Sequence, residues 1–318
     1  MYRHLASEAG NQALGAPQDV RHRAFRMRRT GLHSMGRVEK MRWLASANKE
    51  TVMWQRRRWL AAAGAGWLGI GPVWGQAAAG TVGVVILHGK GGGPRGLVLP
   101  LAEALQARGM RVRNLAMPWS GRRHYDAGPE SAQEQVAQAI AELKREGAQR
   151  VFLVGHSQGG VFALHLAALL PLAGVVALAP GGNVASPVFE THLGSERRLA
   201  RELVAAGRGA DVQTFADFEG SKGKNAVQAR ADVYWAWFDP QGVMNQERAI
   251  RAVPVNLPVL YVAPTGDFPA LRRANPGLYS QLPSKALSRY AEPNASHTEV
   301  PTEAASLVGD WLMETAAR

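Results

Sequence analysis

Cysteine is absent from this 318-residue chain. Its absence excludes disulfide bonds, zinc sites built from thiolates, iron–sulfur clusters and cysteine nucleophiles. A nucleophile must therefore be Ser, Thr, Asp, Lys or a similar side chain. The HExxH pattern of zinc hydrolases is missing as well, and the sequence predicts neither a metal nor a cofactor.

An excess of basic charge is missing from most of the chain, although the overall net charge is +12. Residues 1–79 contain 13 Lys and Arg against 4 Asp and Glu, a net +9, whereas residues 80–318 contain 24 against 21, a net +3. A nearly balanced body lacks the electrostatic surface of a nucleic-acid-binding domain. We therefore predict no nucleic-acid partner for residues 80–318.

Apolar runs long enough to span a membrane are also lacking. Three arginines at 56–58 precede an apolar run over 59–74 that is about 15 residues long, and alanines at 77–79 follow. A spanning helix needs about 20 apolar residues, whereas a basic start, a short apolar run and small exit residues are typical of an export signal. We predict an export signal peptide over 53–79, and a non-structured extension or an over-called gene start over 1–52.

The run Arg56-Arg57-Arg58-Trp59-Leu60 resembles a bacterial twin-arginine signal. In that pattern an arginine pair is followed by any residue, then an aromatic or apolar residue, then Leu. The run departs from the usual pattern at Gln55 and Ala61, where Ser or Thr and a basic residue are common. The resemblance implies export of a folded protein to the bacterial periplasm, with no stable membrane span after signal removal.

From residue 80 onward, apolar runs rich in Val and Leu alternate with amphipathic segments. Strands are expected over 81–89, 111–118, 150–157, 173–182 and 257–267, with a short one near 287–293. Helices are expected over 97–109, 130–147, 159–171 and 302–316. Near-continuous apolar strands suit parallel pairing under helices on both faces. The pattern predicts an α/β domain over 80–318 with a doubly wound, mostly parallel sheet and a site at the carboxyl ends of its strands.

A longer stretch without a strong strand signal, residues 184–253, interrupts this alternation. Helical patterns near 195–207 and 225–238 predict a helical cap inserted into the α/β domain. The second pattern contains an aromatic cluster: Tyr234, Trp235, Trp237 and Phe238. The cluster is compatible with a helix–sheet packing face and with the lining of an acyl or aromatic pocket.

The strongest chemical motif is GHSQG, residues 155–159, between the expected strand over 150–157 and the Ala/Leu-rich helix that follows. A sharp strand-to-helix turn that exposes a serine nucleophile needs small residues at Gly155 and Gly159 because neighbouring backbone passes close by. The alternative is a glycine-rich turn with a capping serine. The strand before the motif and the helix after it favour a nucleophile at Ser157.

With this motif in this context, residues 81–318 resemble the α/β-hydrolase superfamily. The resemblance implies that Ser157 is a serine nucleophile and that the HG-containing loop beginning His88-Gly89-Lys90 forms an oxyanion loop. By that likeness, the oxyanion donors are the main-chain N–H groups of Lys90 and Gln158. A P-loop and a dinucleotide fingerprint both fail, since the glycine-rich run lacks the GK[ST] ending and has Pro94 at the third glycine position.

The order of the family's triad is Ser, then an acid, then His. Asp267 follows the expected strand over 257–267, with Asp239 as its main competitor, and His297 lies 30 residues beyond Asp267. The resemblance implies Ser157, Asp267 and His297 as the triad.

Together these features predict an exported serine hydrolase that cleaves a small-molecule carboxylic ester through an acyl-enzyme. The same triad serves acyltransferases, thioesterases and peptidases, which stay open as alternatives. A non-catalytic binding protein of the same fold is the alternative outside the enzymes. Acyl-chain length, natural substrate and oligomeric state do not follow from the residues.

Overall fold

A computed structural model describes residues 79–220 and 222–318. The predictions for 1–52 and 53–79 lie, apart from Ala79, outside the described residues. Within the described part, no helix is both long enough and apolar enough to cross a membrane.

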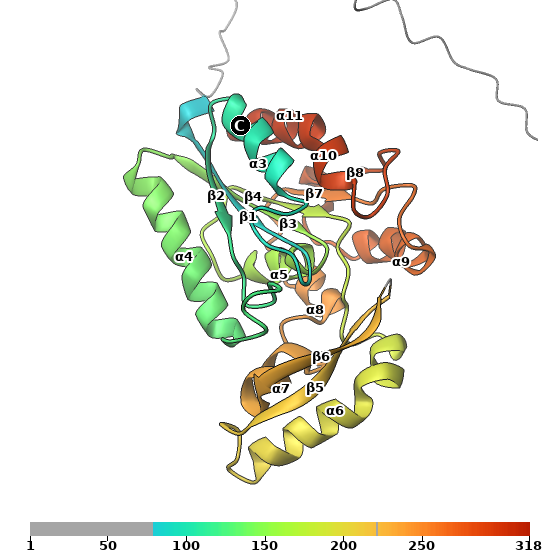
Figure 1. The fold of residues 1–318 in the computed structure, drawn as a ribbon. Helices are drawn as coiled ribbons and strands as arrows, with labels where there is room; N and C mark the ends of the chain where they lie inside the picture. The colour runs from blue at the N-terminus through green and yellow to red at the C-terminus, as the bar shows by residue number, and fades with distance from the viewer. Residues whose placement is uncertain (1–78, 221) are drawn as a thin grey trace, which may run out of the picture. The chain divides into compact units, whose positions relative to one another are not determined.

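The body of the protein is a six-stranded sheet in which every neighbouring pair of strands is parallel (Figure 1). Its spatial order is β2-β1-β3-β4-β7-β8. The strands are β1 (Val82–Leu87), β2 (Arg111–Leu115), β3 (Arg150–His156), β4 (Gly174–Leu178), β7 (Val259–Val262) and β8 (Arg289–Ala291). Each lies inside a segment expected to be a strand, so the prediction of a doubly wound α/β sheet is confirmed.

Helices cover both faces of the sheet, which explains the continuous apolar runs. In β1, Val84 and Ile86 face a core shared with α3 and α11, whereas Val85 and Leu87 face a core shared with α4 and α5. The helices are α3 (Leu99–Ala107), α4 (Pro129–Arg145), α5 (Gln158–Leu166), α9 (Pro269–Ser280), α10 (Val300–Glu303) and α11 (Ala305–Ala316). The α9 helix was not expected from the sequence.

The strand order places a switch point between β1 and β3. From β1 the chain moves outward to β2, then returns past β1 to β3 and continues in the opposite direction. Ligand sites of open α/β sheets lie outside the carboxyl ends of strands at such a point. Leu87 is in register with Gly155, so the loop after β1 and the turn after β3 leave the sheet side by side.

The prediction of an all-helical cap over 184–253 needs correction. The segment contains α6 (Pro187–Ala205), α7 (Ala231–Phe238) and α8 (Gln246–Arg251), but also an antiparallel hairpin of β5 (Val212–Glu219) and β6 (Gly223–Arg230). Residues 225–230, expected to begin a helix, are therefore strand. The hairpin strands are only partly buried, so they lack the continuous apolar signature that reveals the strands of the body.

The aromatic cluster of the insertion is mainly a packing face. Tyr234, Trp237 and Phe238 are almost fully buried, whereas Trp235 is partly exposed. Trp237 packs edge-on against Trp119 at 5.3 Å between ring centroids, and its indole N–H donates to the Ala127 carbonyl at 2.8 Å. These contacts attach the insertion to the segment between β2 and α4. The insertion lies at one end of the sheet (Figure 1).

Candidate active site

Ser157 sits on a strained turn between β3 and α5. Its φ of +53° is unusual for a residue with a side chain. A Cβ at Gly155 would lie 2.1 Å from the Gly159 carbonyl oxygen, and one at Gly159 would lie 2.6 Å from that of Leu87. Both positions therefore require glycine, and their close backbone contacts hold Ser157 at the carboxyl edge of the sheet, where it is partly exposed.

The structure brings Ser157, His297 and Asp267 into one line of hydrogen bonds. His297 Nε2 lies 2.9 Å from Ser157 Oγ, and His297 Nδ1 lies 2.8 Å from Asp267 Oδ1. The loop after β7 bridges to the loop after β8 at Gly266 and Ser296, which places the acid beside the histidine. A carboxylate at Nδ1 holds that nitrogen protonated, so Nε2 is left to accept a proton from the serine hydroxyl.

The acid is well buried. Asp267 is 4% exposed, and its Oδ1 also accepts the Phe268 N–H at 2.7 Å. The competing Asp239 follows α7 as its C-cap and accepts the Gln241 N–H instead. Of the two carboxylates, the structure therefore pairs Asp267 with His297.

His156, the neighbour of Ser157, is a site residue that sequence reasoning did not single out. Its Nε2 lies 2.8 Å from the His297 carbonyl oxygen, so Nε2 carries the proton and donates. Its Nδ1 has no hydrogen-bond partner among the described residues. Burial, reinforced by the nearby His297, lowers the pKa of His156 to about 4. The His156 ring is therefore neutral at pH 7 when it donates to the main chain at His297.

His88 begins the loop after β1, and its ring makes two hydrogen bonds that stabilise the loop. The Met117 N–H donates to His88 Nε2 at 3.0 Å, so His88 Nδ1 carries the proton and donates to the Gly89 carbonyl at 2.7 Å. Burial lowers the pKa of His88 and keeps the ring neutral. Farther along the loop, the Gly91 N–H donates to the Trp119 carbonyl at 2.9 Å.

The two expected oxyanion donors, the N–H groups of Lys90 and Gln158, belong to segments next to Ser157. Gly89 lies directly against the serine, since a Cβ on it would lie 3.1 Å from Ser157 Cβ, and Lys90 follows Gly89. Gln158 is the first residue of α5, where an N–H has no partner within its own helix. Across residues 79–220 and 222–318, the Lys90 N–H has no acceptor either. Both N–H groups can therefore serve a substrate oxygen.

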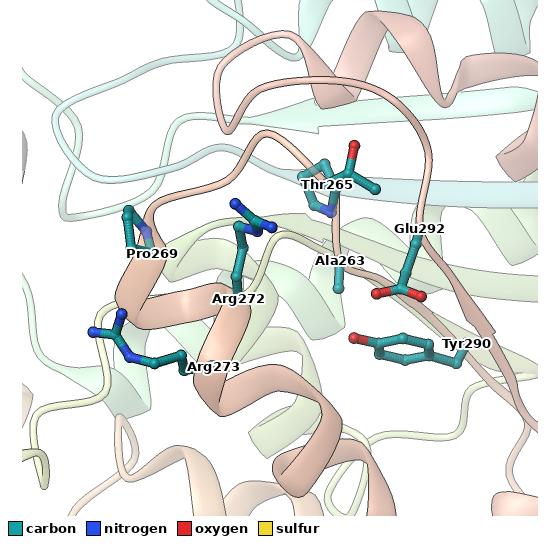
Figure 2. Close-up of a pocket in the computed structure, with 8 residues that line it drawn as sticks. Ala263, Thr265, Pro269, Arg272, Arg273, Tyr290 and Glu292 are labelled. Carbon is teal, nitrogen blue, oxygen red and sulfur yellow. The ribbon is translucent and has the colours of Figure 1, made fainter.

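A separate hollow of about 400 Å³ lies at the carboxyl ends of β7 and β8 (Figure 2). Arg272, Arg273, Tyr290 and Glu292 give it a polar wall. Thr265 lines it two residues before Asp267, but neither Ser157 nor His297 is among its lining residues. The hollow therefore borders the acid's loop without containing the hydrogen-bonded line.

Comparison with known proteins agrees with this fold. The model of the alpha/beta hydrolase family matches residues 84–309, and no curated protein matches the chain. A structure of LipS and LipT, two metagenome-derived lipolytic enzymes, is 17% identical over 75% of this chain and 94% of that one, with a TM-score of 0.52. The monoacylglycerol lipase of Paleococcus ferrophilus is 21% identical over 73% and 94%, with a TM-score of 0.51.

A third solved structure, Est1E of Butyrivibrio proteoclasticus with bound ferulic acid, is 15% identical over 74% of this chain and 90% of that one, with a TM-score of 0.51. At these identities the structural likenesses show the fold. The family model covers well over half of the chain. The chain therefore belongs to the alpha/beta hydrolase family, and this membership supports a hydrolase as the class of protein.

Proposed function

We propose that this protein is a serine hydrolase that cleaves small-molecule carboxylic esters through Ser157, His297 and Asp267. The observation that carries the proposal is the unbroken hydrogen-bonded line from Ser157 Oγ through His297 to Asp267, at 2.9 Å and 2.8 Å. The line begins at a strained nucleophile position beside two N–H groups that can serve an oxyanion. That combination is the requirement for acyl transfer through a covalent intermediate.

In the proposed reaction, His297 Nε2 takes the hydroxyl proton as Ser157 Oγ attacks the ester carbonyl. Asp267 orients the imidazole and stabilises its cation, while the N–H groups of Lys90 and Gln158 bind the oxyanion. The protonated His297 then gives its proton to the departing alcohol, leaving an acyl-serine. Water attacks this ester with His297 as base, which releases the acid and restores the serine.

The direct test is hydrolysis of p-nitrophenyl esters from acetate to palmitate, combined with a fluorophosphonate label located by peptide mapping. We expect turnover and labelling at Ser157, and both should disappear in Ser157→Ala. Turnover that survives in Ser157→Ala would overturn the proposed nucleophile. Product analysis with a competing alcohol separates hydrolysis from acyl transfer.

The two carboxylates that the sequence left in competition provide a matched pair. In other triads, replacing the acid by its amide lowers kcat about 10⁴-fold, so we expect a loss of about 10³- to 10⁴-fold for Asp267→Asn. Asp239→Asn should retain near wild-type kcat, since Asp239 only caps a turn with the Gln241 N–H. Equal losses in the two variants would contradict the assignment of the acid.

We also propose that the protein is exported to the periplasm of a bacterium. The support is the sequence over 53–79, with three arginines before a short apolar run and small residues after it. Cell fractionation of the tagged full chain, with Arg56, Arg57 and Arg58 replaced by Lys in the control, should show a processed periplasmic form that the control lacks. An unprocessed cytoplasmic protein in both strains would overturn export.

A further inference from the structure

A buried carboxylate of the inserted hairpin reaches the loop after β1 and the loop between β2 and α4. Asp217, on β5, is 5% exposed. Its Oδ1 accepts from Lys90 Nζ, in the loop after β1, and its Oδ2 accepts the Tyr125 hydroxyl at 3.0 Å. An insertion residue thereby contacts two segments of the body that lie far from it in the sequence.

The Lys90 side chain is held from several sides. Besides its ion pair with Asp217, Nζ donates to the Phe218 carbonyl at 3.0 Å. The ammonium also lies 5.3 Å from the ring centroid of Phe189 and 5.5 Å from that of Phe238, within the range of cation–π attraction. An ammonium in this position has little freedom, so it restrains the backbone of Lys90.

The second oxygen of Asp217 leads to Gln158. The Tyr125 hydroxyl has one proton, and if that proton goes to Asp217, the hydroxyl oxygen can accept from Gln158 Nε2, 3.4 Å away. Burial and the charge of Asp217 both raise the pKa of Tyr125 well above its ordinary value. Tyr125 therefore stays protonated, and its hydroxyl links the Asp217 carboxylate to the Gln158 side chain by two hydrogen bonds.

We propose that Asp217 is a positioning residue for the oxyanion site, holding Lys90 by an ion pair and Gln158 through Tyr125. This inference rests on the proposed function, in which the backbone N–H groups of Lys90 and Gln158 bind the oxyanion. One carboxylate then sets the positions of both donors.

A buried ion pair is a poor source of stability. Removing two charges from water costs about as much as their attraction returns, so packing alone does not account for Lys90 and Asp217. A need to hold the oxyanion donors in place does account for this ion pair, because a displacement of about 1 Å at a reacting centre can cost about 100-fold in rate. The inserted hairpin thereby sets the geometry of donors that belong to the body.

The test compares Asp217→Asn and Lys90→Met with a matched control, Asp211→Asn. Asp211 immediately precedes the hairpin and pairs with Arg208, but it contacts neither loop of the site. We expect kcat on a short p-nitrophenyl ester to fall about 10- to 100-fold in the first two variants, with KM within about threefold of wild type. The control should retain wild-type kcat.

A trifluoromethyl ketone of matching chain length adds a readout specific to the oxyanion. Ser157 adds to its carbonyl and creates an oxyanion at the proposed donors, so its inhibition constant should rise in parallel with the loss of kcat. If Asp217 had only a structural role, its replacement would lower the yield of active enzyme, and the inhibition constant of the remaining active enzyme would not rise with the loss of kcat. Wild-type kcat and wild-type inhibition in Asp217→Asn would overturn the inference.

Amide hydrogen exchange of the loop after β1 and the start of α5 decides the matter independently of activity. We expect faster exchange there in Asp217→Asn than in the control, with β3 amides unchanged. If the wild type neither turns over esters nor takes the fluorophosphonate label, the proposed function fails. Unchanged exchange in Asp217→Asn would instead overturn the positioning role, whether or not the wild type is active.

Discussion

The sheet and the inserted hairpin stabilise their strands in different ways. All six residues of β1 and all five of β4 are buried, because helices cover both faces of the sheet. In β6 only Val227 and Ala229 are buried, and its remaining side chains are wholly or partly exposed. The body is thus stabilised by a continuous apolar interior, whereas the hairpin depends on a few anchors and on its attachment to the body.

That difference also separates what each region contributes to the site. The body holds Ser157, Asp267 and His297 in the segments that follow the parallel strands β3, β7 and β8. The insertion supplies Asp217, whose carboxylate contacts Lys90 and Tyr125 in loops of the body. Under the proposed function, the reacting side chains belong to the body and the insertion positions the loops that bind the oxyanion, as expected where functional loops are held by a scaffold.

The largest expected effect is the loss of stability when a side chain is added at Gly155 in the body. A Cβ at Gly155 would lie 2.1 Å from the Gly159 carbonyl oxygen, so Gly155→Ala must move backbone at the centre of the sheet. We expect a loss of at least about 4 kcal/mol in the free energy of unfolding, measured by denaturant titration. Gly220→Ala in the insertion is the control: its Cβ would meet no atom within 4 Å, and stability should change by less than about 0.5 kcal/mol.

A matched pair of phenylalanines tests whether the two regions open together. Phe152 on β3 packs against Trp311 of the body, whereas Phe215 on β5 stacks on Tyr234 at 4.2 Å between ring centroids. We expect Phe152→Ala to lower the global free energy of unfolding by about 3–5 kcal/mol. Phe215→Ala should speed hydrogen exchange of the hairpin while leaving β1 and β3 protected. Equal exchange effects in both regions would show that body and insertion unfold as one unit.

The smallest expected effect is the pH dependence contributed by His156. Its pKa is about 4 in the folded protein against 6.5 ordinarily, so between these values the unfolded chain binds more protons and stability falls as the pH falls. From pH 7.5 to 4.5 this group should cost about 2–3 kcal/mol of unfolding free energy. Denaturant titrations at both pH values measure it.

His156→Gln removes this titration and can still donate to the His297 carbonyl. The variant should therefore lose less stability than the wild type between the two pH values. A part of the dependence should remain, since burial also lowers the pKa of His88. An identical loss of stability in variant and wild type would contradict the assignment to His156.

Most of the body could be predicted from the sequence because its signals are local. Continuous apolar runs indicate strands buried on both faces, and the two glycines around Ser157 indicate the sharp turn between strand and helix. The hairpin was missed because neither VQTFADFE nor GKNAVQAR contains a continuous apolar run, and a two-stranded ribbon is stabilised by what it packs against. His156 and Asp217 were missed for a related reason: their importance comes from partners distant in the sequence.

The residue pattern alone is enough to predict the α/β architecture, the order of Ser157, Asp267 and His297 along the chain, and the glycines that let the chain turn at Ser157. These follow from periodicity and steric limits, which act among neighbouring residues. The folded arrangement is needed to see that Asp267 rather than Asp239 pairs with His297, that the aromatic cluster is packed, and that Asp217 lies beside Lys90. Those outcomes depend on which loops meet at the edge of the sheet, and that is set by strand order and register.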